Sequence, residues 1–295
     1  MRMNVARLAP PPRAVRADVA AERAIGRVAV QSLYWELVLY PKPGLVSLRD
    51  SGAHEDMDAT TFFRSLFSLR HYFVAIAQAG ARGTSMAELR RLGLNAEGRM
   101  LRATGGVNTH RGAIFTLGLL SAAAGRAWIR GAGASDAALR EVLLRDWQRD
   151  LIAVPAPAAT VPSHGQQVAA RYRVAGARGE AVHAFPSVFE IGLPALRDAL
   201  ARGAGLHRAR LHAFFALAAE VDDTNVLFRG GARARDRVQR GAAEFIASGS
   251  VFADGWHDRA EMLHLECSRA RVSPGGCADL LAAACFVHEW QALAR

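Results

Sequence analysis

Hydrophobic positions along this chain recur at the three- and four-residue spacing of amphipathic helices, and no segment shows the strict alternation of a half-buried strand. The first such run extends from Asp18 to Tyr40, where Pro41 ends it. The stretch from Gly112 to Ala124 is apolar almost all round, as expected of a buried central helix. The pattern predicts helices over residues 18–40, 62–76, 112–124, 136–149, 166–174, 211–227, 238–248 and 278–294.

These helices predict an all-α fold, with a buried central helix and long loops that carry function. The length, 295 residues, suits one large domain or two small ones. The Pro- and Ala-rich stretch 154–162 is predicted to be a long loop, but neither side of it makes a complete domain. Residues 1–14 include three successive prolines and no helical periodicity, which is typical of a flexible tail. We therefore expect a tail over 1–14 and a single all-α catalytic domain over 15–295.

Composition favours a soluble protein, since hydrophobic residues make up 51 % of the chain and charged residues 22 %. No uninterrupted apolar run has the length of a membrane span, and arginines interrupt the N-terminal segment where a signal peptide has its apolar core. The three cysteines, Cys267, Cys277 and Cys285, lack metal-ligand spacing and are expected to be inert thiols. We expect a cytoplasmic protein without a membrane partner.

The formal net charge of +10 raises the question of nucleic-acid binding. The arginines are spread along the whole chain, however, and no zinc-finger, RNP or helix-turn-helix signature accompanies them. A positive field also suits a small substrate that carries several phosphates. We therefore expect no nucleic-acid partner.

A stiff loop follows the first predicted helix. Two prolines flank Lys42, which suits a lysine that meets a phosphate at a fixed place. In the acid-rich stretch after it, Asp56 and Asp58 could hold a divalent cation through oxygen ligands. The alternative for Asp58 is that it caps the next helix.

Glu36 is an unusual residue for its position, because it lies within the apolar stripe of the first predicted helix, above Ile25. A carboxylate there needs a partner, since burying it alone is costly. It is predicted to be either a member of an internal ion pair or an active-site acid.

The segment before the central helix resembles an anion cradle. Gly105 and Gly106 would let a phosphate approach backbone N–H groups at the positive end of the helix dipole. Thr109 or Asn108 could cap the helix, while His110 and Arg111 would add side-chain contacts. The alternative is a plain turn.

Two adjacent aspartates, Asp222 and Asp223, follow the apolar run that starts at Leu211. If the helix continues, Asp222, Asn225 and Arg229 lie on one face. Neighbouring carboxylates repel each other, and a bound cation would offset that repulsion. This pair is the strongest site signal in the chain.

Two further segments carry weaker signals. Arg178 and Glu180 flank a glycine and would equally form a structural ion pair. A second glycine pair before an apolar helix predicts another anion cradle, formed by Ser273, Gly275 and Gly276. The alternative is a plain helix start, with Asp279 in the first turn only complementing the helix dipole.

Taken in order, these segments resemble the triphosphoribosyl-dephospho-CoA synthase family over about residues 20–290. The matching stretches are ELVLYPKPGLV (36–46), GAHEDMD (52–58), TGGVNTHRGAIF (104–115), GARGE (176–180), DDTN (222–225), RGG (229–231), SPGG (273–276) and ADLL (278–281). The residues SLRD (47–50) and LRHYF (69–73) are similar to the branch that serves malonate decarboxylase. One departure is Ala184, where the family often has a glycine before Phe-Pro.

The resemblance implies that the 2′-hydroxyl of 3′-dephospho-CoA attacks the anomeric carbon of the ATP ribose and that adenine leaves. The product would be 2′-(5″-triphosphoribosyl)-3′-dephospho-CoA, which a separate phosphoribosyl-dephospho-CoA transferase attaches to the acyl-carrier protein. Mg²⁺ would be the cofactor, and ATP and 3′-dephospho-CoA the substrates. Whether the chain forms a homo-oligomer is left open by the sequence.

The same resemblance suggests roles for the residues singled out above. Asp222 and Asp223 would bind metal or stabilise the sugar, with Glu36, Asp56 and Asp58 as further candidates. Glu180 or His110 would act as the base. The phosphates of both substrates would be held by Lys42, Gly105, Gly106, Asn108, Arg111, Arg178, Asn225, Arg229, Ser273, Gly275 and Gly276. Two alternatives remain, a magnesium-dependent hydrolase of N-glycosidic bonds and the citrate lyase branch of the same family.

Overall fold

A computed structural model describes residues 13–153 and 164–293, and most of them lie in helices with no strand among them. The predicted all-α class is therefore confirmed. The helices are α1 (Arg13–Val38), α2 (Ala59–Ala81), α3 (Met86–Ala103), α4 (Arg111–Ile129), α5 (Asp136–Val142), the π-helix η1 (Leu143–Trp147), α6 (Gln148–Ala153), α7 (His164–Tyr172), α8 (Gly176–Val182), the π-helix η2 (Ser187–Gly192), α9 (Leu193–Ala201), α10 (Leu206–Glu220), α11 (Thr224–Ala247), the 3₁₀-helix η3 (Ser250–Phe252), α12 (Trp256–Arg269) and α13 (Gly275–Leu293).

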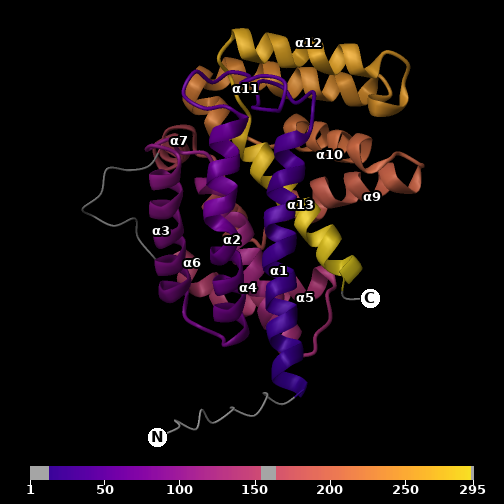
Figure 1. Cartoon of the computed structure of the whole chain (residues 1–295). Coiled ribbons are helices and arrows are strands. Elements are labelled where there is room, and N and C mark those ends of the chain that lie inside the picture. Colours follow the sequence, from indigo (N-terminus) through magenta and orange to yellow (C-terminus); the bar gives the residue numbers. More distant parts are fainter. Residues whose placement is uncertain (1–12, 154–163, 294–295) are drawn as a thin grey trace, which may run out of the picture.

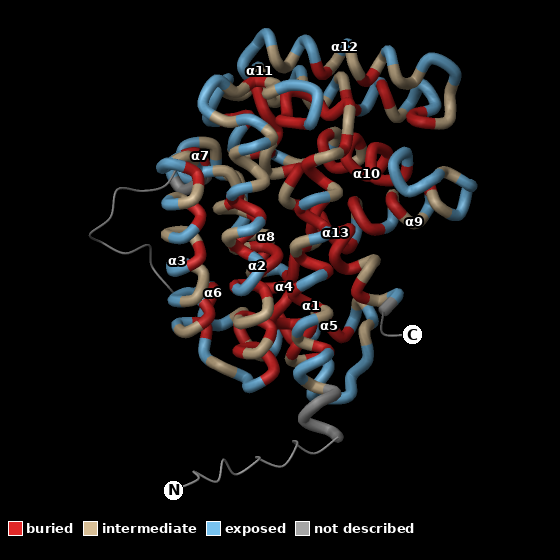
Figure 2. Tube along the Cα trace, viewed as in Figure 1, coloured by how far each residue is buried: buried red, intermediate tan, exposed pale blue. Residues whose placement is uncertain are grey.

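Helix α4 forms the centre of the bundle, as its apolar sequence predicts, and packs against α1, α2 and α13 (Figure 1). Its contact with α2 is close because both helices place glycines there: a Cβ atom on Gly80 would lie 2.0 Å from the Ala122 carbonyl oxygen, and one on Gly125 would lie 2.2 Å from that of Ala77. Among the described helices, α4 alone has the length and composition of a membrane span, but most of it is buried inside the protein. Buried positions follow the inward faces of the surrounding helices (Figure 2).

Helices α11 and α12 lie as a pair across one end of this bundle (Figure 1). Helix α10 packs against α9, α11 and α13, and it contacts α11 through the stacked rings of Phe215 and Phe245, whose centroids lie 4.0 Å apart. The predicted helix over 211–227 is wrong, because α10 ends at Glu220 and an extended residue, Val221, separates it from α11. The periodicity also missed α3, α9 and α12.

The predicted tail and long loop fall largely outside the described residues. Helix α1 begins at Arg13, two residues inside the predicted tail, and nothing further is described for residues 1–12 or 154–163. Near the middle of the chain, Ala184 has a φ of 56° and is fully buried. This left-handed conformation favours glycine, so an alanine at this position is strained.

Candidate active site

The end of α1 and the loop after it form a buried ion pair. The Lys42 Nζ atom donates hydrogen bonds to the Glu36 carbonyl oxygen, at 2.6 Å, and to the Glu36 carboxylate. Both side chains are almost inaccessible to solvent. Burial lowers the pKa of Lys42, and the charge of Glu36 opposes this effect. Of the two roles predicted for Glu36, the structure shows the internal ion pair. Its partner is the Lys42 ammonium group, which was expected to meet a phosphate.

His264, a buried residue of α12, holds the loop that carries Lys42. Its Nδ1 atom lies 2.6 Å from the Lys42 carbonyl oxygen, and its Nε2 atom lies 3.1 Å from both carboxylate oxygens of Asp50. The hydroxyl of Tyr40 donates to Glu261 of the same helix at 2.6 Å. Sequence analysis did not identify His264, because its partners are more than 200 positions away and its own neighbourhood is an ordinary surface helix.

Asp223 caps two helices at once. Its Oδ1 atom accepts hydrogen bonds from the backbone N–H groups of Asn225 and Val226 at the start of α11, at 2.8 and 3.3 Å. Its Oδ2 atom accepts one from the Cys277 N–H in the first turn of α13, at 2.8 Å. Burial raises the pKa of Asp223, and these backbone donors oppose the rise. A Cβ atom on Gly276 would lie 3.0 Å from Oδ2, so the glycine allows the helix to approach the carboxylate.

The predicted anion cradle before α13 is filled by side chains of the protein. The N–H of Cys277 donates its hydrogen bond to Asp223, and the Ser273 hydroxyl lies 3.0 Å from Nε2 of His54. A Cβ atom on Gly275 would lie 3.0 Å from Nδ2 of Asn225. These glycines therefore serve close packing in this structure, and the expected free amides are not all available to a phosphate.

Asp222 lies on the surface and has a different partner from its neighbour. Its carboxylate accepts a hydrogen bond from Arg235 at 2.9 Å, and its side chain is 45 % exposed. Because the helix breaks at Val221, Asp222 and Asn225 do not share one helical face as predicted. The repulsion expected between Asp222 and Asp223 is offset in this structure by an arginine beside the first carboxylate and by backbone N–H groups around the second.

A third carboxylate, Asp279 of α13, lies against the start of α4. A Cβ atom on Gly112 would fall 1.9 Å from its Oδ2 atom, and the Ala113 N–H donates to the carboxylate. Asp279 remains partly accessible to solvent, unlike Glu36 and Asp223. Burial raises its pKa well above the usual range, and the charges of Glu36 and Asp223 raise it further. The sequence pattern gave Asp279 no role beyond complementing the helix dipole; its place in an SPGG-x-A-D segment was the available signal.

His110 begins α4 and is held in its neutral form. Its Nδ1 atom lies 2.6 Å from the Ser65 hydroxyl oxygen, and the edge of its ring meets Phe62 at a centroid distance of 4.9 Å. Its Nε2 atom is buried with no partner among the described residues. Burial, and then the charge of Lys42, lower the pKa of His110 to about 3. Such a ring is a weak proton acceptor at neutral pH, so it suits hydrogen bonding better than general base catalysis.

The glycine segment before α4 forms a turn with structural partners. Gly105 and Gly106 have φ angles of 67° and 94°, and both are exposed with open space around them. Neither Thr109 nor Asn108 is the N-cap of α4, which is His110 without a side-chain capping bond, although the Asn108 side-chain oxygen accepts from the Arg111 N–H at 3.2 Å. The Arg111 side chain pairs with Glu97 at 3.0 Å. The structure thus shows the turn, and its open glycines leave room for a ligand.

Arg178 and Glu180 do not pair with each other. Arg178 donates to the carbonyl oxygens of Leu151 and Ile152 at the end of α6. Glu180 accepts from the N–H and the hydroxyl of Ser187, at 3.1 and 2.6 Å. Burial raises the pKa of Glu180, and the bonds from Ser187 oppose the rise. Both residues therefore have structural partners near the middle of the chain.

The acid-rich loop is joined to α11 by Arg229, which donates to Nδ1 of His54 at 3.1 Å. Asp58 is the N-cap of α2, as the alternative prediction held, and forms a capping box with Thr61. Asp56 is 62 % exposed and lies 3.7 Å from His54. Burial lowers the pKa of His54, and the charge of Arg229 lowers it further.

The four residues predicted to bind metal do not form one cluster. Asp222, Asp223 and Asp58 each have the separate partners described above, and only Asp56 keeps its carboxylate open. In the part of the chain that the structure describes, the one group of three His, Cys, Asp or Glu residues with ligand atoms within 4.8 Å of one another is His257, Asp258 and Glu261. Magnesium often needs only one or two carboxylates when a substrate supplies phosphate oxygens, so the open Asp56 fits such an ion.

Comparison with known proteins extends over nearly the whole chain. A protein of Stutzerimonas stutzeri (strain A1501), named probable 2-(5″-triphosphoribosyl)-3′-dephosphocoenzyme-A synthase, is 44 % identical over 280 residues, which cover 92 % of this chain and 93 % of the relative. The 2-(5″-triphosphoribosyl)-3′-dephosphocoenzyme-A synthase of Klebsiella pneumoniae is 39 % identical, with 89 % and 93 % covered. No solved structure matches the chain. Residues 22–295 match the family described as ATP:dephospho-CoA triphosphoribosyl transferase, and the chain belongs to that family.

Proposed function

We propose that this protein transfers the triphosphoribosyl group of ATP to the 2′-hydroxyl of 3′-dephospho-CoA. In this step the bond from C1′ of the ATP ribose to N9 of adenine breaks, and a bond from C1′ to the acceptor oxygen forms. The acceptor hydroxyl loses a proton, and adenine leaves with one. The triphosphate stays on the transferred sugar. The support is the family membership over residues 22–295, together with Asp279, which lies against the start of α4.

The observation that carries the proposal is the position of Asp279. Glycosyl transfer passes through an oxocarbenium-like state, in which positive charge develops on the sugar and a nearby carboxylate stabilises it. Lys42 already neutralises Glu36, and three backbone N–H groups hold Asp223. Asp279 is partly accessible and has no cationic partner among the described residues. It is therefore the carboxylate best placed to face a sugar.

Asp279 also suits the role of the base that takes the acceptor proton. A carboxyl group whose pKa lies above its usual range is closer to the pH at which proton transfer is efficient. Glu180 is engaged by Ser187, and the pKa of His110 is about 3. We therefore place Asp279 ahead of both residues for this role, and we assign His110 to hydrogen bonding.

Magnesium, the malonate system and the cytoplasm belong to the same proposal. A bound Mg²⁺ would neutralise the triphosphate, and Asp56 is the predicted ligand that fits it. The residues SLRD (47–50), similar to the malonate branch, lie in the loop that His264 holds through Asp50. The product would pass to a phosphoribosyl-dephospho-CoA transferase acting on the acyl-carrier protein of malonate decarboxylase, and the reaction would take place in the cytoplasm.

Product analysis tests this function directly. The purified protein is incubated with ATP, 3′-dephospho-CoA and magnesium, and the products are identified by mass spectrometry. We expect one adenine for each covalent adduct, and no adenine when dephospho-CoA is left out. Free triphosphoribose would show a hydrolase that uses water as acceptor. ADP with a phosphorylated acceptor would show a kinase instead.

A further inference from the structure

The start of α4 holds two buried polar atoms that the rest of the protein leaves unpaired. They are Nε2 of His110 and Oγ1 of Thr109, and neither has a hydrogen-bond partner among the described residues. His110 as a whole is only 3 % exposed. A buried donor or acceptor without a partner costs free energy, and native proteins rarely leave one unless a water or a ligand satisfies it. The two atoms therefore indicate a place where a ligand completes the hydrogen bonding.

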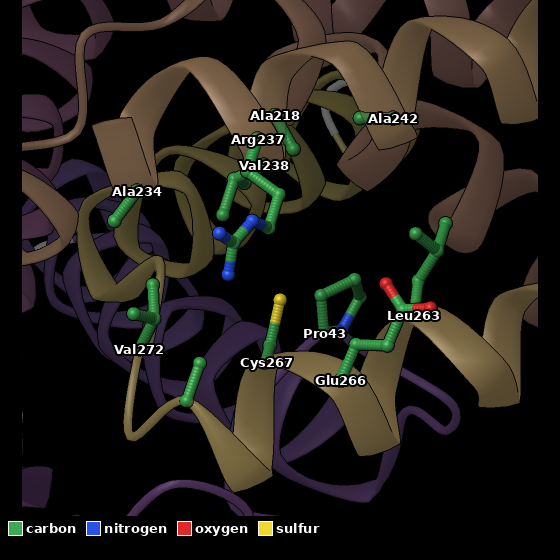
Figure 3. Close-up of a pocket in the computed structure, with 11 residues that line it drawn as sticks. Pro43, Ala218, Ala234, Arg237, Val238, Ala242, Leu263, Glu266, Cys267 and Val272 are labelled. Atoms are coloured by element: carbon green, nitrogen blue, oxygen red, sulfur yellow. The ribbon is translucent and has the colours of Figure 1, made fainter. Parts of the chain in front are cut away.

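The cavity between α11 and α12 is too small for a substrate. Its walls are mainly apolar and include Pro43 and Leu263 (Figure 3), and its volume of about 30 Å³ leaves room for a water or two. The surface at the start of α4 is more open. A Cβ atom on Gly105 or Gly106 would meet nothing beyond its chain neighbours within 4 Å among the described residues, and Asp279 is partly accessible. A ligand can therefore approach α4 from this side.

The contact with Ser65 places the proton of His110 on Nε2. The Ser65 hydroxyl lies 2.6 Å from Nδ1 and has no other acceptor among the described residues, so it donates its hydrogen to that nitrogen. A neutral histidine whose Nδ1 accepts a hydrogen bond carries its own proton on Nε2. Burial, followed by the charge of Lys42, lowers the pKa of His110 to about 3, so the ring is neutral at physiological pH. Nε2–H is therefore an uncharged donor that still lacks an acceptor.

The surroundings of this donor suit an uncharged heteroaromatic ring better than a phosphate. The imidazole meets Phe62 at a centroid distance of 4.9 Å, and the backbone N–H of His110 points to the sulfur of Met100 at 3.3 Å. Phe62 is itself partly exposed, so one side chain lies between the imidazole and solvent on that side. The carboxylate of Asp279 lies against Gly112, two residues further along α4, and would repel a phosphate bound beside it.

We propose that Nε2–H of His110 donates a hydrogen bond to N7 of the ATP adenine and stabilises adenine as the leaving group. This inference rests on the proposed function. When the bond from C1′ to N9 breaks, its electron pair moves onto adenine, and N7 shares the negative charge because it belongs to the same five-membered ring as N9. The imidazole keeps its proton, as a neutral histidine donor does in other enzymes. The proton that adenine takes up balances the one that the acceptor hydroxyl loses.

The test compares ATP with 7-deaza-ATP, in which a carbon replaces N7 and cannot accept the hydrogen bond. The assay measures kcat/KM for release of the base by the full chain at a fixed concentration of dephospho-CoA. His110→Asn keeps an oxygen for the Ser65 hydroxyl and removes the donor, whereas His110→Gln places an amide N–H near the position of Nε2. We expect the preference of the wild type for ATP to fall about tenfold or more in His110→Asn and to return in part in His110→Gln. Comparing variants is essential, because the analogue also changes the intrinsic reactivity of the base.

His212 of α10 provides the matched control, because it is also buried and its Nδ1 atom lies 2.8 Å from the Ser250 hydroxyl. His212→Asn should leave the preference unchanged. Ser65→Ala, which releases the proton of His110 to either nitrogen, should lower the preference and repeats the test if His110→Asn does not fold. An equal preference in the wild type and His110→Asn would overturn the inference even if the transfer reaction is confirmed. A change confined to 3-deaza-ATP would overturn the assignment to N7. A wild-type protein that releases no adenine from ATP and dephospho-CoA would refute the proposed function itself.

Discussion

Replacing Asp279 by asparagine should separate the chemistry of the site from its scaffolding. The amide keeps an oxygen for the N–H of Ala113 and removes a charge that lies near the negative charges of Glu36 and Asp223. If the carboxylate serves packing, its replacement should lower the stability of the protein. If it serves through its charge, its replacement should lower turnover only.

The sign of the stability change follows from the pKa. The pKa of Asp279 in the folded protein is raised above its ordinary value of 3.8. The free energy of unfolding therefore falls as the pH rises from about 3.8 to the raised pKa, because the buried carboxyl group becomes charged in that range. At higher pH the loss of stability remains. Each pKa unit corresponds to about 1.4 kcal/mol. Asp279→Asn should therefore raise the free energy of unfolding at pH 7 and make no difference below about pH 3. A gain of 1 kcal/mol would raise the thermal midpoint by roughly 2 °C in a chain of this size.

Turnover should move in the opposite direction. Loss of an electrostatic contact to the reacting centre costs about a hundredfold or more in rate, which is roughly 3 kcal/mol. The assay measures adenine release at saturating ATP and dephospho-CoA, and thermal unfolding at pH 3 and pH 7. Asp222→Asn is the matched control, because its exposed pair with Arg235 should contribute less than about 1 kcal/mol and nothing to turnover. Near-normal turnover of Asp279→Asn, or a lower thermal midpoint at pH 7, would refute the reasoning.

Three further substitutions test the surrounding residues. Lys42→Met should reduce the free energy of unfolding by about 3–5 kcal/mol in urea titrations, because it leaves Glu36 buried without its partner, and adding Glu36→Gln should restore much of the loss. Asp223→Asn should cost about 1–3 kcal/mol in the same titrations, because an amide has one acceptor oxygen and leaves a buried backbone N–H of α11 or α13 unpaired; an unchanged midpoint would contradict the double cap. His110→Asn should leave the shape of the kcat/KM profile between pH 5 and 8 unchanged, because the wild-type ring has a pKa of about 3; loss of a limb near pH 6.5 would show that His110 titrates in the free enzyme.

Much of the fold could be predicted from local spacing. The run from Gly112 to Ala124 is apolar on all sides, and it became the central helix because only a position inside the bundle buries every face. Asp58 caps α2, as its position before an apolar run suggests, whereas the N-cap of α4 is His110 and not the predicted Thr109 or Asn108. The glycine segments before α4 and α13 lie at helix starts as expected, but Arg178 and Glu180, expected in a turn, lie within α8.

The roles of individual acids depended on the tertiary structure. Asp222 and Asp223 are neighbours in sequence, but the chain leaves the helix at Val221, just before them. Asp222 therefore pairs with Arg235 on the surface, and Asp223 lies between the starts of α11 and α13. The surroundings of Asp279 depend on the packing of α13 against Gly112 of α4. Sequence alone determined an all-α protein with its polar residues gathered in a few loops. Tertiary packing decided which of those carboxylates are neutralised, because their partners are distant in the chain and burial and charge act through space.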